Sequence, residues 1–248
     1  MTRARASATH LAISAALATL VFLGVYFVWY PGALFDVAGG KDLLRIMITV
    51  DVIVGPLLTL VVFKPGKPGL AFDLAVIAVA QLTALGYGLW AFAESRPVYI
   101  AFVKDRFELA RANEIPDEAL LHGHMSRWRD LPWTGPKLVG VRFPTDADEK
   151  FRLMVSGMAG ADIQCYPQYH VPYDSERAEV RAQAQPVADL LKYNKGLTLE
   201  AIARERRIDP AATAYLPMRA GKSDLTVFVD RASGNVVDIA HYRPWQYQ

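Results

Sequence analysis

Three long apolar stretches fill most of the first 93 residues, and they constrain this chain more than any other feature. They span residues 11–30, 46–63 and 74–93. Each has about 18–20 residues, enough for a helix rising 1.5 Å per residue to cross a hydrocarbon core of ~30 Å. No comparable stretch follows. The sequence therefore predicts a membrane domain over residues 1–93, a bundle of three transmembrane helices in contact with membrane lipid, followed by residues 94–248.

Residues 94–248 have the composition of a soluble domain. Six of the 27 Lys and Arg residues and four of the 25 Asp and Glu residues precede Glu94, so the rest of the chain carries equal numbers of both signs. A neutral domain lacks the basic surface by which proteins bind nucleic acid, so we expect no nucleic-acid partner. Cys165 is the only cysteine, which excludes an internal disulfide and a cysteine-rich zinc site.

Charges flanking the apolar stretches predict how the chain crosses the membrane. The first stretch is longer than the apolar region of a cleaved signal peptide and lacks a small-residue cleavage site after it, so we expect an uncleaved anchor. Cytoplasmic segments are enriched in Lys and Arg. The basic residues before the first stretch and between the second and third outnumber those between the first and second: Arg3, Arg5, Lys64 and Lys67 against Lys41 and Arg45. We expect a multi-pass protein of the cell inner membrane, with a cytoplasmic N-terminus and a periplasmic C-terminal domain.

Aromatic residues give two further expectations. Four of them lie near the predicted outer boundary and would form an interfacial belt: Trp29, Tyr30, Trp90 and Tyr99. Eight others cluster in loop-like or terminal stretches, and they would form either a recognition surface or part of the core: Trp128, Trp133, Tyr166, Tyr169, Tyr173, Tyr242, Trp245 and Tyr247.

Asp51 is an acidic residue inside the second apolar stretch, about five residues (~7.5 Å) from its expected outer end. Such a residue costs roughly 2.5–3.5 kcal/mol to insert at a helix centre and normally faces protein. It either binds a partner or handles a proton, or it hydrogen-bonds within the bundle or reaches the interface. Gln81 is a possible hydrogen-bond partner, and Pro56, after Gly55, predicts a kink. Asp51, Gly55, Pro56 and Gln81 are therefore the candidate site residues.

The pattern after the third stretch predicts an α+β domain. Strand-like runs predict hairpins over residues 97–112 and 224–241, the second with a Gly-containing turn, and a strand at residues 138–143. Capping residues and periodicity predict helices at residues 117–124, 146–157, 175–193 and 197–207, the third interrupted at Pro186. Helices between two hairpins are typical of an α+β fold.

Residues for catalysis or metal binding are few. His122 and His124 offer two close nitrogens, and Cys165 with His170 is a conceivable nucleophile and base. Two histidines in a loop-like stretch are more often plain surface residues, and nucleophile pairs usually come from distant segments. No phosphate-binding glycine loop or metalloprotease motif is present. We expect no catalytic site, no metal and no cofactor.

Several short motifs together resemble a known family. They lie in the membrane region, at its junction with the soluble domain, and at the C-terminal end: Trp29-Tyr30-Pro31-Gly32, Asp51 with Gly55-Pro56, Lys64-Pro65-Gly66-Lys67, Phe72-Asp73-Leu74, Arg96-Pro97-Val98-Tyr99, Asp105-Arg106-Phe107 and Arg243-Pro244-Trp245. The chain resembles the TfpX/TfpZ (FimB-like) family of type IV pilin accessory proteins. The resemblance covers nearly the whole length and is weakest over residues 119–213.

The resemblance implies an inner-membrane, non-enzymatic chaperone or modulator of pilin stability, assembly and surface display. The implied partner is a cognate type IV major pilin, and no cofactor is implied. The alternative is a membrane-anchored envelope hydrolase with a periplasmic active site built from His122, His124, Cys165 and His170.

Overall fold

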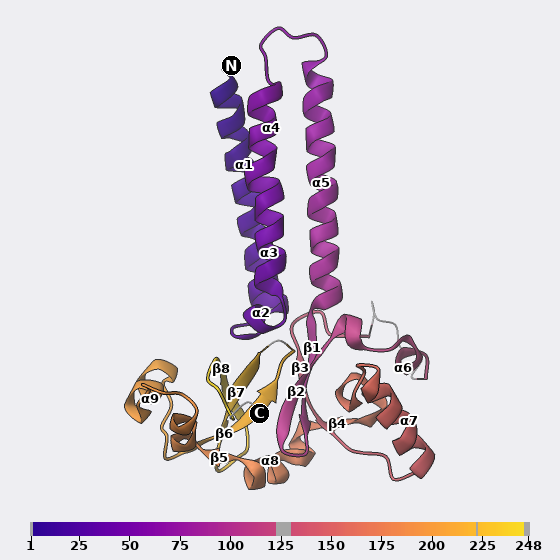
Figure 1. Ribbon diagram of the computed structural model, residues 1–248, viewed down its shortest axis with the longest axis vertical. Coiled ribbons are helices and arrows are strands. Elements are labelled where there is room, and N and C mark those ends of the chain that lie inside the picture. Colours follow the sequence, from indigo (N-terminus) through magenta and orange to yellow (C-terminus); the bar gives the residue numbers. More distant parts are fainter. Residues whose placement is uncertain (1, 123–129, 222, 246–248) are drawn as a thin grey trace.

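The computed structural model describes residues 2–122, 130–221 and 223–245. Three helices long and apolar enough to cross a membrane rise from a folded domain (Figure 1), and they span Arg3–Trp29, Gly40–Val62 and Leu70–Ser95. The shortest has 23 residues and is about 35 Å long. Large apolar side chains such as Leu20, Val61 and Phe72 point outward and are exposed, as suits contact with lipid. All three expected helices are present, and each is longer than its apolar stretch.

Two of the three helices contain a π-helical turn. The first consists of α1 (Arg3–Gly24) and η1 (Val25–Trp29), and the second of α3 (Gly40–Ile48), η2 (Thr49–Val54) and α4 (Gly55–Val62). The third is α5 (Leu70–Ser95), which is α-helical throughout. A short helix, α2 (Leu34–Val37), lies between the first two helices at the end near the sheet, while the N-terminus and the α4–α5 turn lie at the opposite end (Figure 1).

Among the described residues, eight strands form one mixed sheet in the order β4-β3-β1-β2-β6-β7-β8, and β5 pairs with β6. The pairs β1–β3 and β2–β6 are parallel, and the other pairs are antiparallel. Both expected hairpins are present, β1–β2 and β7–β8. The strand bounds are β1 Pro97–Val103, β2 Arg106–Arg111, β3 Lys137–Val141, β4 His170–Pro172, β5 Gln185–Pro186, β6 Thr213–Arg219, β7 Asp224–Asp230 and β8 Val236–Ala240.

Four α-helices lie outside the membrane bundle in the described residues: α6 Asp117–His122, α7 Ala147–Met158, α8 Arg177–Gln183 and α9 Leu199–Arg206. The Asp146 side chain caps α7 by accepting a hydrogen bond from the Glu149 amide, as the sequence predicts. The 3₁₀ turns are η3 Ala112–Glu114, η4 Ile163–Cys165, η5 Pro167–Tyr169, η6 Tyr173–Glu176 and η7 Val187–Lys192. A membrane bundle followed by an α+β domain is therefore confirmed as the fold class.

Two of the differences from expectation involve prolines. The helix expected over residues 175–193 ends at Gln183, because the residue before Pro186 favours an extended backbone, and η7 follows instead of a second α-helix. Strand β6 was not expected either, and it contains Pro217, a residue that disfavours an interior strand. On the edge away from β7, β6 pairs with β5 and then β2, and Pro217 lies between the two paired segments, where its missing N–H is not needed.

The largest hydrophobic cluster joins the bases of the membrane helices to the sheet. It contains Tyr30, Phe35 and Phe92 together with Phe102 and Leu216. Tyr30 is fully buried, and its hydroxyl donates to the Phe92 carbonyl at 2.9 Å. The bundle and the sheet therefore share one core.

The expected aromatic belt is wrong for two of its four members. Tyr30 and Tyr99 are buried, because they pack in the core beneath the bundle and in the sheet. Trp90 is exposed, and Trp29 packs against Trp133 with ring centroids 5.8 Å apart.

The second aromatic group divides between core and surface. Tyr173 and Tyr242 are core residues, while Tyr166, Tyr169 and Trp245 are half-buried. Trp128 and Tyr247 lie outside the described residues.

Arg96 is the single residue between α5 and β1, and it is buried. Its Nε donates to the Pro132 carbonyl at 3.0 Å and its Nη1 to the Ala93 carbonyl at 2.5 Å. The guanidinium lies 4.2 Å from the centroid of the Trp133 ring. The Arg96 side chain thus ties the end of α5 to the segment that precedes β3.

Candidate functional site within the membrane helices

Pro56, residue 17 of the 23 in the second membrane helix, removes one backbone donor from that helix. Within the π-helical turn η2, the Gly55 amide donates to the Val50 carbonyl, five residues back. The next bond in that pattern would join the amide of residue 56 to the Asp51 carbonyl, but proline has no N–H. The Asp51 carbonyl therefore lacks a donor from its own helix.

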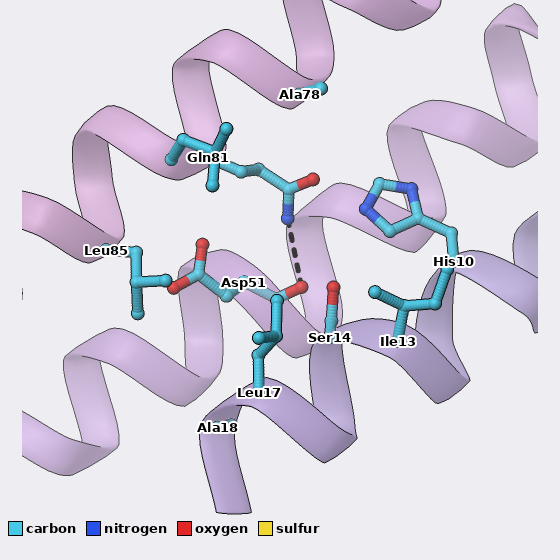
Figure 2. A pocket seen from close by; sticks show the side chains of 10 residues that line it. His10, Ile13, Ser14, Leu17, Ala18, Asp51, Ala78, Gln81 and Leu85 are labelled. Carbon is cyan, nitrogen blue, oxygen red and sulfur yellow. Dashed lines mark hydrogen bonds between the residues drawn. The ribbon is translucent and has the colours of Figure 1, made fainter. Parts of the chain in front are cut away.

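Gln81 of α5 supplies the missing donor. Its Nε2 donates to the Asp51 carbonyl at 3.0 Å (Figure 2). Gly55 makes this contact possible, because a Cβ at that position would lie 2.0 Å from Gln81 Nε2. The structure thus brings all four candidate residues together. Pro56 leaves the Asp51 carbonyl without a helical donor, Gln81 supplies one, and Gly55 leaves room for the Gln81 side chain. The expected Asp51–Gln81 hydrogen bond exists, but through the Asp51 backbone and not its carboxyl group.

The first membrane helix contributes a polar face that sequence reasoning missed. Ser7 Oγ donates to the Pro56 carbonyl at 2.9 Å, and His10 Nδ1 lies 2.6 Å from Thr59 Oγ1. Ser14, one turn further, is buried in the same interface. The spacing of Ser7, His10 and Ser14 places them on one side of a helix, and this spacing was the signal available in the sequence.

A cavity of about 180 Å³ lies between the three helices at this level. Its polar lining comes from His10, Ser14, Asp51 and Gln81, one or more from each helix. The remaining lining is apolar: Ile13, Leu17, Ala18, Ala78, Leu82 and Leu85. Because Ile13 and Leu82 are also more than half exposed, the cavity opens at the side of the bundle.

The Asp51 carboxyl group is buried without a partner. The residue is 7% exposed, and neither Oδ1 nor Oδ2 has a hydrogen-bond partner among the described residues. Figure 2 shows the carboxyl group turned toward Leu85 and away from His10. If the Asp51 carboxyl group is ionised, no cation among the described residues pairs with it. If it is protonated, its hydroxyl has no acceptor among those residues. The carboxyl group therefore neither hydrogen-bonds within the bundle nor reaches the interface, which were two of the possibilities left open by the sequence.

The second membrane helix begins earlier than its apolar stretch. The helix begins at Gly40 rather than Ile46, so Asp51 is residue 12 of 23, about 16 Å from the helix start. The distance of Asp51 from the outer membrane boundary stays a prediction, because the added turns carry the charged residues Lys41, Asp42 and Arg45. Lys41 pairs with Asp36, and Arg45 with Asp42, at 3.5 and 3.7 Å.

Of the four side chains in the hydrolase alternative, the structure describes those of Cys165 and His170. Cys165 is 1% exposed, and burial raises the pKa of its thiol to about 12, which disfavours the thiolate. His170 Nε2 lies 3.0 Å from the Gln164 carbonyl, the ring packs on Tyr99, and burial lowers the pKa of the imidazole. His124 and the side chain of His122 lie outside the described residues. No metal-type group of three or more His, Cys, Asp or Glu residues occurs in the described part of the chain.

One carboxyl group of the sheet titrates near neutral pH. Desolvation raises the pKa of Glu108 on β2 to about 7. Arg219 and Arg106 act in the opposite direction, and Asp162 and Asp224 add to the rise. The nearest ionic partner is Arg219, with Nη1 3.9 Å from Glu108 Oε1. The group is poised to couple the stability of the sheet to pH.

Comparison with known proteins places the chain in a family. It is 32% identical over 195 residues to "Fimbrial assembly protein, serogroup I" of Dichelobacter nodosus, across 77% of this chain and 75% of that protein. The chain belongs to the fimbrial assembly protein FimB family. The family model for fimbrial assembly protein FimB matches residues 1–39, which include the polar face of α1.

A second relative, "Fimbrial assembly protein, serogroup E1" of Dichelobacter nodosus, is 27% identical over 225 residues, covering 89% of this chain and 87% of that protein. The similarity to this relative therefore extends over both the membrane helices and the sheet. No solved structure matches the chain. The resemblance read from the sequence motifs is confirmed.

Proposed function

We propose that this FimB family member is an accessory protein of type IV pilus assembly that binds a pilus subunit, its cognate major pilin, and catalyses no reaction. The observation that carries the proposal is the similarity, over most of the chain, to two proteins named for fimbrial assembly. The buried state of Cys165 and the engaged ring of His170 favour binding over catalysis. The role is to stabilise the pilin and support its assembly and surface display.

We further propose that the protein spans the inner membrane three times, with the sheet in the periplasm. Arg3 and Arg5 lie at the same end of the bundle as the turn with Lys64 and Lys67, far from the sheet (Figure 1). Four basic residues at that end favour the cytoplasm. Alkaline phosphatase fused after Gln248 is expected to be active and a green fluorescent protein fusion there dark. The opposite pattern would overturn the orientation.

Complementation of a deletion strain tests the function. Loss of the gene is expected to lower the pilin level on immunoblots and the number of surface pili in electron micrographs. Wild-type protein should restore both. A variant with His122→Ala, His124→Ala, Cys165→Ala and His170→Gln should restore them equally at equal protein level. Loss of pili with that variant at normal accumulation would favour the envelope hydrolase, and normal piliation without the gene would reject the assembly role.

A further inference from the structure

We propose that the cavity beside Asp51 is the docking site for a transmembrane helix of the pilus subunit, and that the Asp51 carboxyl group accepts a hydrogen bond from a donor on that helix. This inference rests on the proposed function and adds the place and chemistry of contact. The matching partner segment is an apolar helix that carries one hydroxyl, amine or amide group near mid-membrane.

The depth of the cavity requires an occupant that is itself in the membrane. Ser14 is residue 12 of 27 in the first helix, Asp51 is residue 12 of 23 in the second, and Gln81 is residue 12 of 26 in the third. All three lining residues therefore lie at the middle of their helices, where the hydrocarbon core excludes soluble ligands. The exposed walls at Ile13 and Leu82 give lateral access from the bilayer.

The unpartnered carboxyl group requires an occupant with a donor. Lipid acyl chains would fill the apolar part of the cavity, but they leave both Asp51 oxygens without a partner. In the membrane, polar side chains of neighbouring helices commonly supply the hydrogen-bond donor for a buried acceptor of this kind. A partner helix satisfies both the apolar walls and the buried oxygens.

A second copy of this chain is a poorer fit. Three outward-facing threonines of the helices, Thr19, Thr49 and Thr83, each donate to a backbone carbonyl four residues back in their own helix. Thr9 is exposed too, and it lies five residues from the level of Ser14, or about 7.5 Å along the axis. The exposed Tyr87 lies six residues from the level of Gln81, or about 9 Å along the axis. The donor is therefore expected from a different protein, and the assembly role identifies the pilus subunit.

Photocrosslinking in intact cells locates the contact. A photoreactive phenylalanine placed at Ile13 or Leu82 should give an adduct that contains the pilin. The matched controls are Leu11 and Val79, which are exposed on the same helices at nearby depth and do not line the cavity. Equal pilin adducts at cavity and control positions, or an adduct only with a second copy, would overturn the proposal.

Two pairs of variants separate docking from folding. Ala78→Phe fills the cavity, and Ala80→Phe adds the same ring on α5 away from the cavity. We expect the first, and not the second, to lower the pilin adduct roughly tenfold at equal protein level. Asp51→Leu should lower it similarly, and Asp51→Asn, which keeps an acceptor, should retain most of it.

Equal adducts for the paired variants Ala78→Phe and Ala80→Phe would overturn the docking site. Pilin levels in the same cells keep this result separate from the assembly role. If the protein restores pili in the deletion strain but the pilin adducts do not depend on the cavity, the docking site is rejected. The accessory function then still stands.

Discussion

Gly55→Ala should destabilise the membrane bundle although alanine is the better helix former. Helix propensity alone favours alanine by about 0.8–1.0 kcal/mol. The new Cβ would lie 2.0 Å from Gln81 Nε2, so the Gln81 amide must turn away and lose its bond to the Asp51 carbonyl. Pro56 offers no replacement donor. A buried acceptor without a partner costs about 1–3 kcal/mol, so the net change runs from about zero to ~2 kcal/mol of lost stability.

A double-mutant cycle isolates this contact. In a Gln81→Ala background the clash is absent, and Gly55→Ala should stabilise the bundle by about 1 kcal/mol. The coupling energy between the two positions is therefore about 1–3 kcal/mol. Unfolding of the full-length protein in detergent micelles, followed by far-UV circular dichroism, measures it.

Gly86→Ala is the matched control. No atom lies within 4 Å of a Cβ there, so this change on α5 should stabilise the bundle in both backgrounds. If Gly55→Ala gave the same stabilisation with and without Gln81, the argument linking Pro56, Asp51 and Gln81 would be refuted.

Three further predictions concern the sheet and its junction with the bundle. The folded-state pKa of Glu108, about 7, lies above its ordinary value of 4.5. Wild type should therefore lose roughly 3 kcal/mol of stability relative to Glu108→Gln as pH rises from about 4.5 to 7, measured by denaturant titration. A stability difference that does not depend on pH would contradict this. Cys165 should resist maleimide at pH 7 until denaturant is added, and rapid labelling of native protein, seen by mass spectrometry, would disprove its burial. Tyr30→Phe should lower stability by about 1–2 kcal/mol through loss of the bond to the Phe92 carbonyl, and unchanged melting would contradict that role.

Local patterns in the sequence predicted the parts of the fold that depend on neighbours along the chain. The three apolar stretches, the β1–β2 and β7–β8 hairpins and the Asp146 cap of α7 each carry a signal within about 20 residues. Strand β6 carries no such signal, because its Pro217 is tolerated only through the particular pairing of both edges, with β7 on one side and β5 and β2 on the other.

The candidate site shows the same division between local and long-range information. Asp51, Gly55, Pro56 and Gln81 were found because a polar residue or a proline is unusual inside an apolar helix. Their actual geometry depends on the meeting of η2 and α5, 30 residues apart, and of α1 and α4, 49 residues apart. The helix also begins six residues before its apolar stretch, and Lys41, Asp42 and Arg45 lie in these first turns.

The buried residue Arg96 joins the third membrane helix directly to the sheet. Helix α5 is about 39 Å long, and it continues into β1 through one residue whose guanidinium is bonded to Ala93 of α5 and to Pro132 in the segment before β3. Strand β1 lies inside the sheet, between β3 and β2, rather than at its edge. We therefore expect a tilt of α5 to be transmitted to the middle of the sheet through this one-residue connection.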